Sequence, residues 1–150
     1  MSNKPSKYGK QYSPINKHKY KGKYPIQVRS SYEDKFCKWC DTNSQVLIWS
    51  SEPIGISYFD PIKQKNRRYF IDFLIVVSDK NTGKRVTYAI EIKPYIQCVP
   101  PVITKGKSKK TRIHEAKTFS TNTAKWKAAI KYCSLKQWKF KLITERELKL

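Results

Sequence analysis

Acidic residues are scarce in this sequence of 150 residues, which has 11 Asp and Glu against 32 Lys and Arg and a formal net charge of +21. A chain with so large a positive charge binds polyanions by displacing their condensed counterions, so nucleic acid is the expected partner. A basic segment that binds membranes should carry bulky apolar residues opposite its lysines, and the lysine-rich stretches here lack such a face. The composition therefore favours nucleic acid over a membrane as the partner.

Long hydrophobic runs are also missing. None approaches the length of a transmembrane helix, and the N-terminus lacks the apolar core of a signal peptide. The chain is therefore expected in the cytosol at synthesis, with its four cysteines reduced. A glycine-rich phosphate loop is absent too, which argues against a nucleotide cofactor and an ATP-driven motor.

Few residues could ligate zinc. The only two histidines, His18 and His114, form no ligand motif. Cys37 and Cys40 form a C-x-x-C pair, but they lie in an expected helix and no second pair accompanies them. Buried thiols are therefore favoured over a zinc or redox site.

Residues 1–28 are rich in lysine and contain no acid, and their tyrosines are interleaved with proline and glycine. This composition predicts a flexible or extended basic arm without a core of its own, followed by one domain over residues 29–150. The arm should lie on DNA phosphates, with a solvated tail as the alternative. The arm lysines are Lys4, Lys7, Lys10, Lys17, Lys19, Lys21 and Lys23, of which the last four are the candidate DNA contacts.

Further candidate contacts with double-stranded DNA lie outside the arm, on an expected strand and in a basic loop that follows Pro100-Pro101. They are Arg67, Arg68, Lys105, Lys107, Lys109, Lys110 and Arg112.

The remaining sequence mixes helical and extended patterns. A helix should begin near Ser30 or Ser31, because a serine stands three residues before Glu33 in a capping-box arrangement. A second helix should cover about residues 121–133, with Trp126, Ile130 and Cys133 on one face. Strands are expected over 46–49, 54–59, 67–77, 86–93 and 140–143, with a turn over 79–84 and a closing helical turn over 145–149. This order predicts an α/β or α+β domain with a mixed central β-sheet flanked by helices.

Two acids interrupt the apolar strands on either side of the turn. If the turn is centred between Asn81 and Thr82, Asp72 faces Glu91 directly across the ladder, at about 5 Å between Cβ atoms. A bulged turn at Gly83 would shift this register by one residue. Facing carboxylates in an apolar sheet repel each other and lose hydration, so stability alone does not explain them.

A divalent cation would remove this repulsion, because carboxylate oxygens are the ligands that Mg²⁺ prefers. The expected ligands are Asp72, Glu91 and the backbone carbonyl of Ile92, with Mn²⁺ as a possible substitute for Mg²⁺. Such an ion can activate water for attack on a phosphodiester, and Lys93 on the same face can hold the water or neutralise developing charge. Alternatively, Glu91 and Lys93 are ordinary solvent-facing residues of an edge strand.

Asp72, a hairpin and then Glu91-Ile92-Lys93 together resemble the motif of the PD-(D/E)xK nuclease superfamily, with Ile71 in place of the proline. The chain from about Arg29 to Leu150 also resembles the N-terminal nuclease domain of transposon-end endonucleases. Its size and lysine-rich N-terminus are similar to those of the head-completion nucleases of T-even-type bacteriophages. The segments that carry the resemblance to the transposon-end enzymes are 31–36, 51–54, 68–73 and 139–148.

The resemblance implies a restriction-endonuclease-like fold and Mg²⁺-dependent hydrolysis of DNA. It also implies an additional catalytic acid on the first helix, which maps to Glu33 rather than Glu52 and could reach the ion through water. The phage likeness implies action on DNA ends during head completion and packaging, in the infected host cytoplasm and the virion, with phage head or portal proteins as partners. The alternative is a non-catalytic DNA-binding protein of the capsid that retains the fold. The intact Asp72, Glu91 and Lys93 argue against it.

Overall fold

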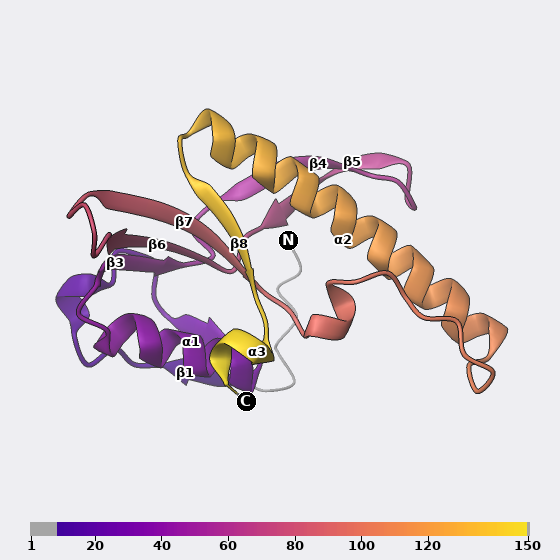
Figure 1. Cartoon of the computed structure of the whole chain (residues 1–150), viewed down its shortest axis with the longest axis horizontal. Helices are drawn as coiled ribbons and strands as arrows, with labels where there is room; N and C mark the ends of the chain where they lie inside the picture. The colour runs from indigo at the N-terminus through magenta and orange to yellow at the C-terminus, as the bar shows by residue number, and fades with distance from the viewer. Residues whose placement is uncertain (1–8, 150) are drawn as a thin grey trace.

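A four-stranded mixed β-sheet lies at the centre of the computed structural model, which describes residues 9–149 (Figure 1). Its strands lie in the order β3 (Val46–Ser51), β6 (Phe73–Ser78), β7 (Arg85–Ile92) and β8 (Lys139–Ile143). The first three pair antiparallel, and β8 runs parallel to β7. The expected mixed sheet in a restriction-endonuclease-like α+β fold is therefore confirmed.

The two faces of the sheet bury different elements. On one face lie α1 (Ser31–Thr42) and α3 (Glu145–Leu148), and on the other lies α2 (Lys109–Leu135) (Figure 1). Side chains alternate along β7, so Ile90 packs toward α1 while Ala89 packs toward α2. Two separate apolar clusters result, and the sheet divides them.

The start of α1 is as expected. Ser30 caps the helix, because its hydroxyl accepts a hydrogen bond from the backbone N–H of Glu33. Cys37 and Cys40 lie on the inner face of α1 and are fully buried, which confirms buried thiols. Burial raises the pKa of both thiols.

The second helix is longer than the sequence pattern predicts. It begins at Lys109, after Ser108 caps it by accepting the N–H of Thr111, so part of the expected basic loop is helical. No glycine or proline interrupts it. The predicted inner face is wrong at Ile130, which is 55% exposed, because Ala129 takes the buried position. Within residues 9–149, no helix combines the length and apolar character that a membrane crossing needs.

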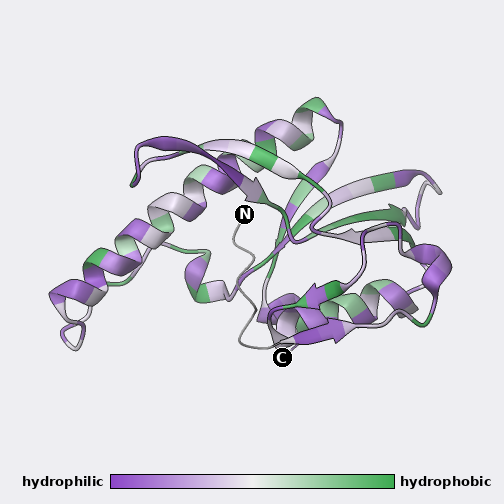
Figure 2. Ribbon diagram, turned by 180° about the vertical axis from the view of Figure 1, so that it is seen from behind, coloured by the Kyte–Doolittle hydropathy of each residue, from purple (hydrophilic) through white to green (hydrophobic). Residues whose placement is uncertain are grey.

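The single strand expected over residues 67–77 is in fact two strands. β5 (Lys65–Phe70) pairs with β4 (Gly55–Asp60) in a separate ribbon, and β6 begins only at Phe73. The ribbon lies against α2, and its far end is strongly hydrophilic (Figures 1 and 2). Ile71 and Asp72 carry the chain from the ribbon into the main sheet. An apolar pattern cannot reveal this change of sheet, because both strands bury side chains.

Residues 9–28 do not form the expected flexible arm. They contain β1 (Lys10–Tyr12), which pairs antiparallel with β2 (Ile26–Val28), and a short 3₁₀ helix between them. Tyr12 and Tyr20 are buried against Trp49 in the same cluster as α1. Tyr12 and Tyr20 thus belong to the hydrophobic core, whereas Tyr24 is exposed. Lys4, Lys7 and Tyr8 lie outside the described residues.

A buried carboxylate holds this N-terminal segment in place. Asp41 of α1 is fully buried and accepts hydrogen bonds from the hydroxyl of Tyr12 at 2.6 Å and from the backbone N–H groups of Ile15 and Asn16 at 2.7 and 2.9 Å. Burial opposes ionisation, but these three donors more than offset it, so the pKa of Asp41 is lowered. One side chain of α1 therefore binds three groups of the segment.

Replacing Asp41 with alanine should lower the free energy of unfolding by about 3 kcal/mol or more, because each hydrogen bond to a charged group contributes about 1.5–3 kcal/mol. Urea unfolding followed by circular dichroism measures the change. Tyr12→Phe, which removes one of the three donors, should cost less than half as much. Equal stability of Asp41→Ala and wild type would show that the segment is not anchored there.

Candidate active site

Asp72 and Glu91 lie at the same level of the central sheet. β6 pairs with β7 in an unbroken register in which Phe73 is opposite Ile90. The same register places Asp72 across from Glu91. The predicted register is confirmed, and Gly83 lies in the turn without shifting it. The carboxylate of Asp72 accepts the backbone N–H of Ile92 at 2.8 Å. The side chain of Asp72 thus extends the hydrogen-bond ladder between β6 and β7. This is possible because Asp72 lies just before β6.

Glu91 is the most constrained acid of the site. It is only 4% exposed, and its two carboxylate oxygens have different partners. The ammonium of Lys93 lies 3.3 Å from one oxygen, and the hydroxyl of Tyr69 donates to the other at 2.5 Å. These contacts come from the residue that follows β7 and from the ribbon strand β5, so two parts of the chain fix the carboxylate.

The proximity and burial of the acids shift their pKa values. Burial, then the charges of Glu91 and Glu33, raises the pKa of Asp72 well above its ordinary value. Burial is also the main reason why the pKa of Glu33 rises to about 7. Burial alone would lower the pKa of Lys93, but Glu91 and Asp72 more than offset it, so that pKa is raised.

The first helix contributes one acid and the loop before β4 another. Glu33 lies in the first turn of α1, close enough to Asp72 for its charge to oppose ionisation there. Glu52, the alternative to Glu33 in the sequence, forms an ion pair with Arg29 and lines the same cleft as Asp72 and Glu91. Its backbone has a φ of 47°, and its N–H donates to the carbonyl of Asp72 at 2.8 Å. The structure therefore brings Glu33, Glu52, Asp72 and Glu91 into one region.

The donor set fits a hydrated magnesium ion better than a metal cage made of side chains. Among the described residues, no three Asp, Glu, His or Cys side chains converge into a complete cation site. Mg²⁺ normally retains several waters and needs only one or two carboxylates from the protein. Asp72, Glu91 and the carbonyl of Ile92 are suited to that number.

The acids open into a cleft of about 730 Å³ with basic walls. Asp72, Glu91 and Lys93 lie on its sheet side, β5 supplies Arg67 and Arg68, and α2 adds a further lysine. Arg67 also pairs with Asp60 at 3.6 Å. Carboxylates surrounded by cations are the arrangement expected of a site that binds a polyanion and acts on it.

Three of the candidate DNA contacts have partners within the protein, and one of them is Arg67, which pairs with Asp60. Lys19 is buried, and its ammonium donates to the carbonyls of Asp41 and Asn43. Lys107 is ion-paired with Glu115 at 2.7 Å. Lys19 is thus poorly placed to reach DNA, whereas Lys107 and Arg67 stay predicted contacts. The exposed candidates are Lys17, Lys21, Lys23, Arg67, Arg68, Lys105, Lys109, Lys110 and Arg112.

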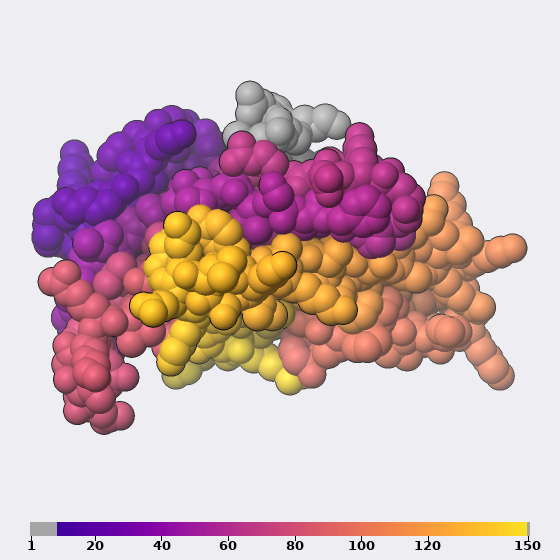
Figure 3. Space-filling view, turned by 90° about the horizontal axis from the view of Figure 1, so that it is seen from above, coloured from indigo at the N-terminus to yellow at the C-terminus, as the bar shows by residue number. Residues whose placement is uncertain are grey.

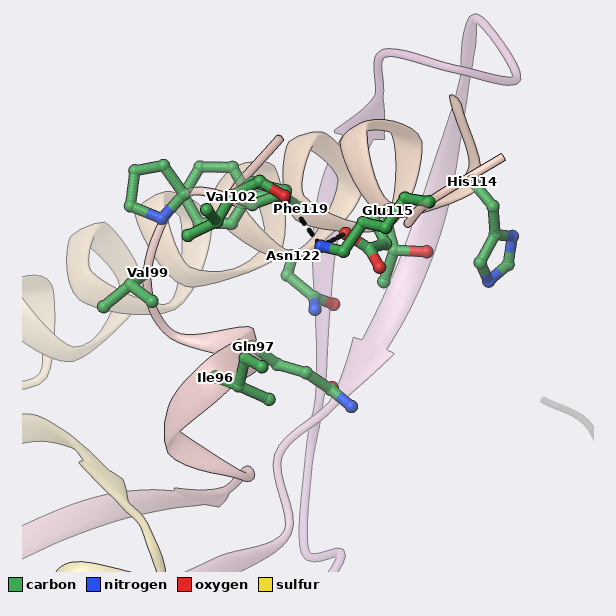
Figure 4. A pocket seen from close by; sticks show the side chains of 12 residues that line it. Ile96, Gln97, Val99, Val102, His114, Glu115, Phe119 and Asn122 are labelled. Atoms are coloured by element: carbon green, nitrogen blue, oxygen red, sulfur yellow. Dashed lines mark hydrogen bonds and ion pairs between the residues drawn. The ribbon is translucent and has the colours of Figure 1, made fainter. Parts of the chain in front are cut away.

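The Lys107–Glu115 pair borders a second cavity, of about 290 Å³, between α2 and the segment that begins with the 3₁₀ helix Tyr95–Gln97 (Figure 4). Phe119 and Asn122 of α2 line it. None of the four acids borders this cavity, so it is distinct from the basic cleft.

Comparison with known proteins identifies the family. Residues 43–145 match the family described as TnsA-like endonuclease N terminal. The chain belongs to this family of endonucleases. It is also 37% identical over 147 residues to the head completion nuclease of Enterobacteria phage T4, across 95% of this chain and 94% of that protein. The family match contains Asp72, Glu91 and Lys93, whereas Glu33 precedes it.

The raised pKa values predict how stability depends on pH in metal-free protein. An acid whose pKa is higher in the folded state stabilises the fold at low pH and loses that contribution as pH rises toward the folded-state pKa. For Glu33 this window runs from about pH 4 to about 7. Asp72 shifts in the same direction, so stability should fall as pH increases.

Asp72→Asn should therefore be more thermostable than wild type in chelator at pH 8, by about 3–5 °C, or roughly 1 kcal/mol in a domain of this size. Differential scanning calorimetry measures the change. Asp79→Asn is the matched control, because turn hydrogen bonds lower the pKa of Asp79 and its loss should destabilise. A destabilised Asp72→Asn would contradict the stated repulsion.

Proposed function

We propose that the chain is a Mg²⁺-dependent endonuclease that hydrolyses phosphodiester bonds in double-stranded DNA. One observation carries the proposal: Asp72 and Glu91 lie at one level of the sheet, beside Lys93, in a basic cleft. The family supports an endonuclease, and the similarity to the head completion nuclease of phage T4 supports a role in head completion. We place this role at DNA ends during packaging. Phage head or portal proteins would then be its protein partners.

Each side chain has a distinct task in this proposal. Asp72, Glu91 and the carbonyl of Ile92 would hold Mg²⁺, which when bound supplies an activated water and a Lewis acid for the phosphate. Glu91 also orients the ammonium of Lys93, 3.3 Å away, toward the cleft. Lys93 would then meet the negative charge that develops on the phosphate as the water attacks.

Glu33 is suited to handle a proton. Its pKa of about 7 means that both protonation states are populated near neutral pH. A group with such a pKa exchanges protons efficiently with a water or an alcohol at that pH. Glu33 would therefore act through a water near Asp72, while the hydroxyl of Ser30 and the charge of Arg29 favour its ionised form.

A non-catalytic DNA-binding capsid protein is the second candidate, because the exposed basic residues would serve it equally well. The cleft argues against it. A pure binder gains nothing from Asp72, Glu91 and Glu52 in a cleft that receives phosphates, since each carboxylate repels the ligand.

Cleavage of linear duplex DNA with and without Mg²⁺ tests the proposal. Asp72→Asn, Glu91→Gln and Lys93→Ala should each reduce the rate by about 10³-fold or more, because each removes a group that acts in the transition state. Affinity for DNA without metal should stay unchanged or become slightly tighter for the two acid variants.

Asp79→Asn in the distant turn is the control and should cleave at the wild-type rate, with Mn²⁺ able to replace Mg²⁺ in both proteins. Full activity of purified Asp72→Asn would place the chemistry elsewhere. DNA binding without any Mg²⁺-dependent cleavage by wild type would bring the capsid-protein candidate forward.

A further inference from the structure

Lys125 of α2 enters the basic cleft from the wall that faces the sheet. Its ammonium lies over two tyrosine rings, 5.9 Å from the centre of Tyr58 and 5.7 Å from that of Tyr69. These rings come from the ribbon strands β4 and β5, which lie along α2 (Figure 3). Tyr69 in turn donates its hydroxyl to Glu91, so only one side chain separates Lys125 from the acids.

The charge on Lys125 has no carboxylate partner among the described residues, where every ion pair involves other cations. Its side chain is half-buried, and burial lowers its pKa. Loss of hydration and the like charge of Lys93 disfavour the ammonium more than the charges of Glu91 and Asp60 favour it. The tyrosine faces compensate only partly, since the two contacts, at 5.9 and 5.7 Å, lie close to the limit of about 6 Å for a cation–π interaction. An uncharged side chain of similar length would stabilise the fold better, so the charge is explained by a ligand.

Lys93 alone does not give the cleft a net positive charge beside the acids. Its ammonium is 3.3 Å from Glu91, which neutralises it locally. A phosphodiester that gains negative charge next to Asp72 and Glu91 therefore needs a second cation nearby. Lys125 lines the same cleft and is not neutralised by an adjacent acid.

We propose that Lys125 binds the phosphate that is cleaved, from the α2 side of the cleft, and so acts as a further catalytic residue beside Lys93. This rests on the proposed function, because it assigns the phosphate to the cleft that holds Asp72 and Glu91. The rings of Tyr58 and Tyr69 hold the ammonium at the wall of the cleft that Lys125 lines.

Three variants test the assignment. Lys125→Met keeps the stem and removes the charge, Lys125→Arg keeps the charge, and Lys127→Met removes an exposed lysine about 200° further round the helix. Single-turnover cleavage of duplex DNA with Mg²⁺ at saturating protein should slow about 10²-fold in Lys125→Met and less than about 10-fold in Lys125→Arg. Lys127→Met should match wild type.

Thermal unfolding separates a catalytic from a structural role. Lys125→Met should unfold at the wild-type temperature or higher, because an unpaired half-buried charge is gone. A lower unfolding temperature with a proportionate loss of cleavage in both Lys125 variants would overturn the proposal, since Lys125 would then serve packing alone. Cleavage by Lys125→Met at the rate of Lys127→Met would overturn it as well.

A binding measurement keeps the assignment separate from the proposed function. With Ca²⁺ in place of Mg²⁺, the dependence of duplex DNA affinity on salt should weaken in Lys125→Met by about one phosphate contact, a slope of about 0.9. If wild type fails to cleave, the endonuclease proposal fails and this slope alone decides on Lys125. An unchanged slope would then reject the phosphate contact.

Discussion

Several acids lie close together in a poorly hydrated region at the carboxyl end of β7, and their charges repel one another. This repulsion determines which of them ionise there. The charges of Glu91 and Glu33 oppose ionisation of Asp72, and Glu52 opposes that of Glu33. Among residues 9–149, Lys93 pairs with an acid of the central sheet and Arg29 pairs with Glu52 at its margin. A divalent cation would relieve the rest of this repulsion. The arrangement would therefore destabilise the metal-free protein and favour binding of a cation. This combination is characteristic of functional sites.

Several elements of the fold hold the charged side chains of this site in place. The break between β5 and β6 frees the side chain of Asp72 to accept the N–H of Ile92. The ribbon that this break creates brings the hydroxyl of Tyr69 within hydrogen-bond distance of Glu91. Helix α2 forms the opposite wall of the cleft. A continuous strand over residues 67–77 would have placed Asp72 in the sheet but left no ribbon, and hence no basic cleft opposite the acids.

Local chemistry was predictable from the sequence, whereas long-range partners were not. The cap at Ser30 and the register that aligns Asp72 with Glu91 follow from spacings within a helix turn and a hairpin. The N-terminal segment is rich in lysine and contains no acid, so its composition indicates a solvated arm. Its packing onto α1 and β3 depends on partners far along the chain, such as Asp41 and Trp49. For the same reason the burial of Lys19 and the place of Lys125 were not apparent, since each depends on elements distant in sequence.

Titration of Mn²⁺ or Mg²⁺ into metal-free protein by calorimetry tests the central claim most directly, which is that repelling acids form a cation site. Protonated acids must release their protons to bind the ion, so the heat should depend on the ionisation enthalpy of the buffer near pH 6. We expect one saturable ion per chain with proton release in wild type, and no saturable binding in Asp72→Asn. Equal binding by both proteins, or no saturable binding by wild type, would contradict the account.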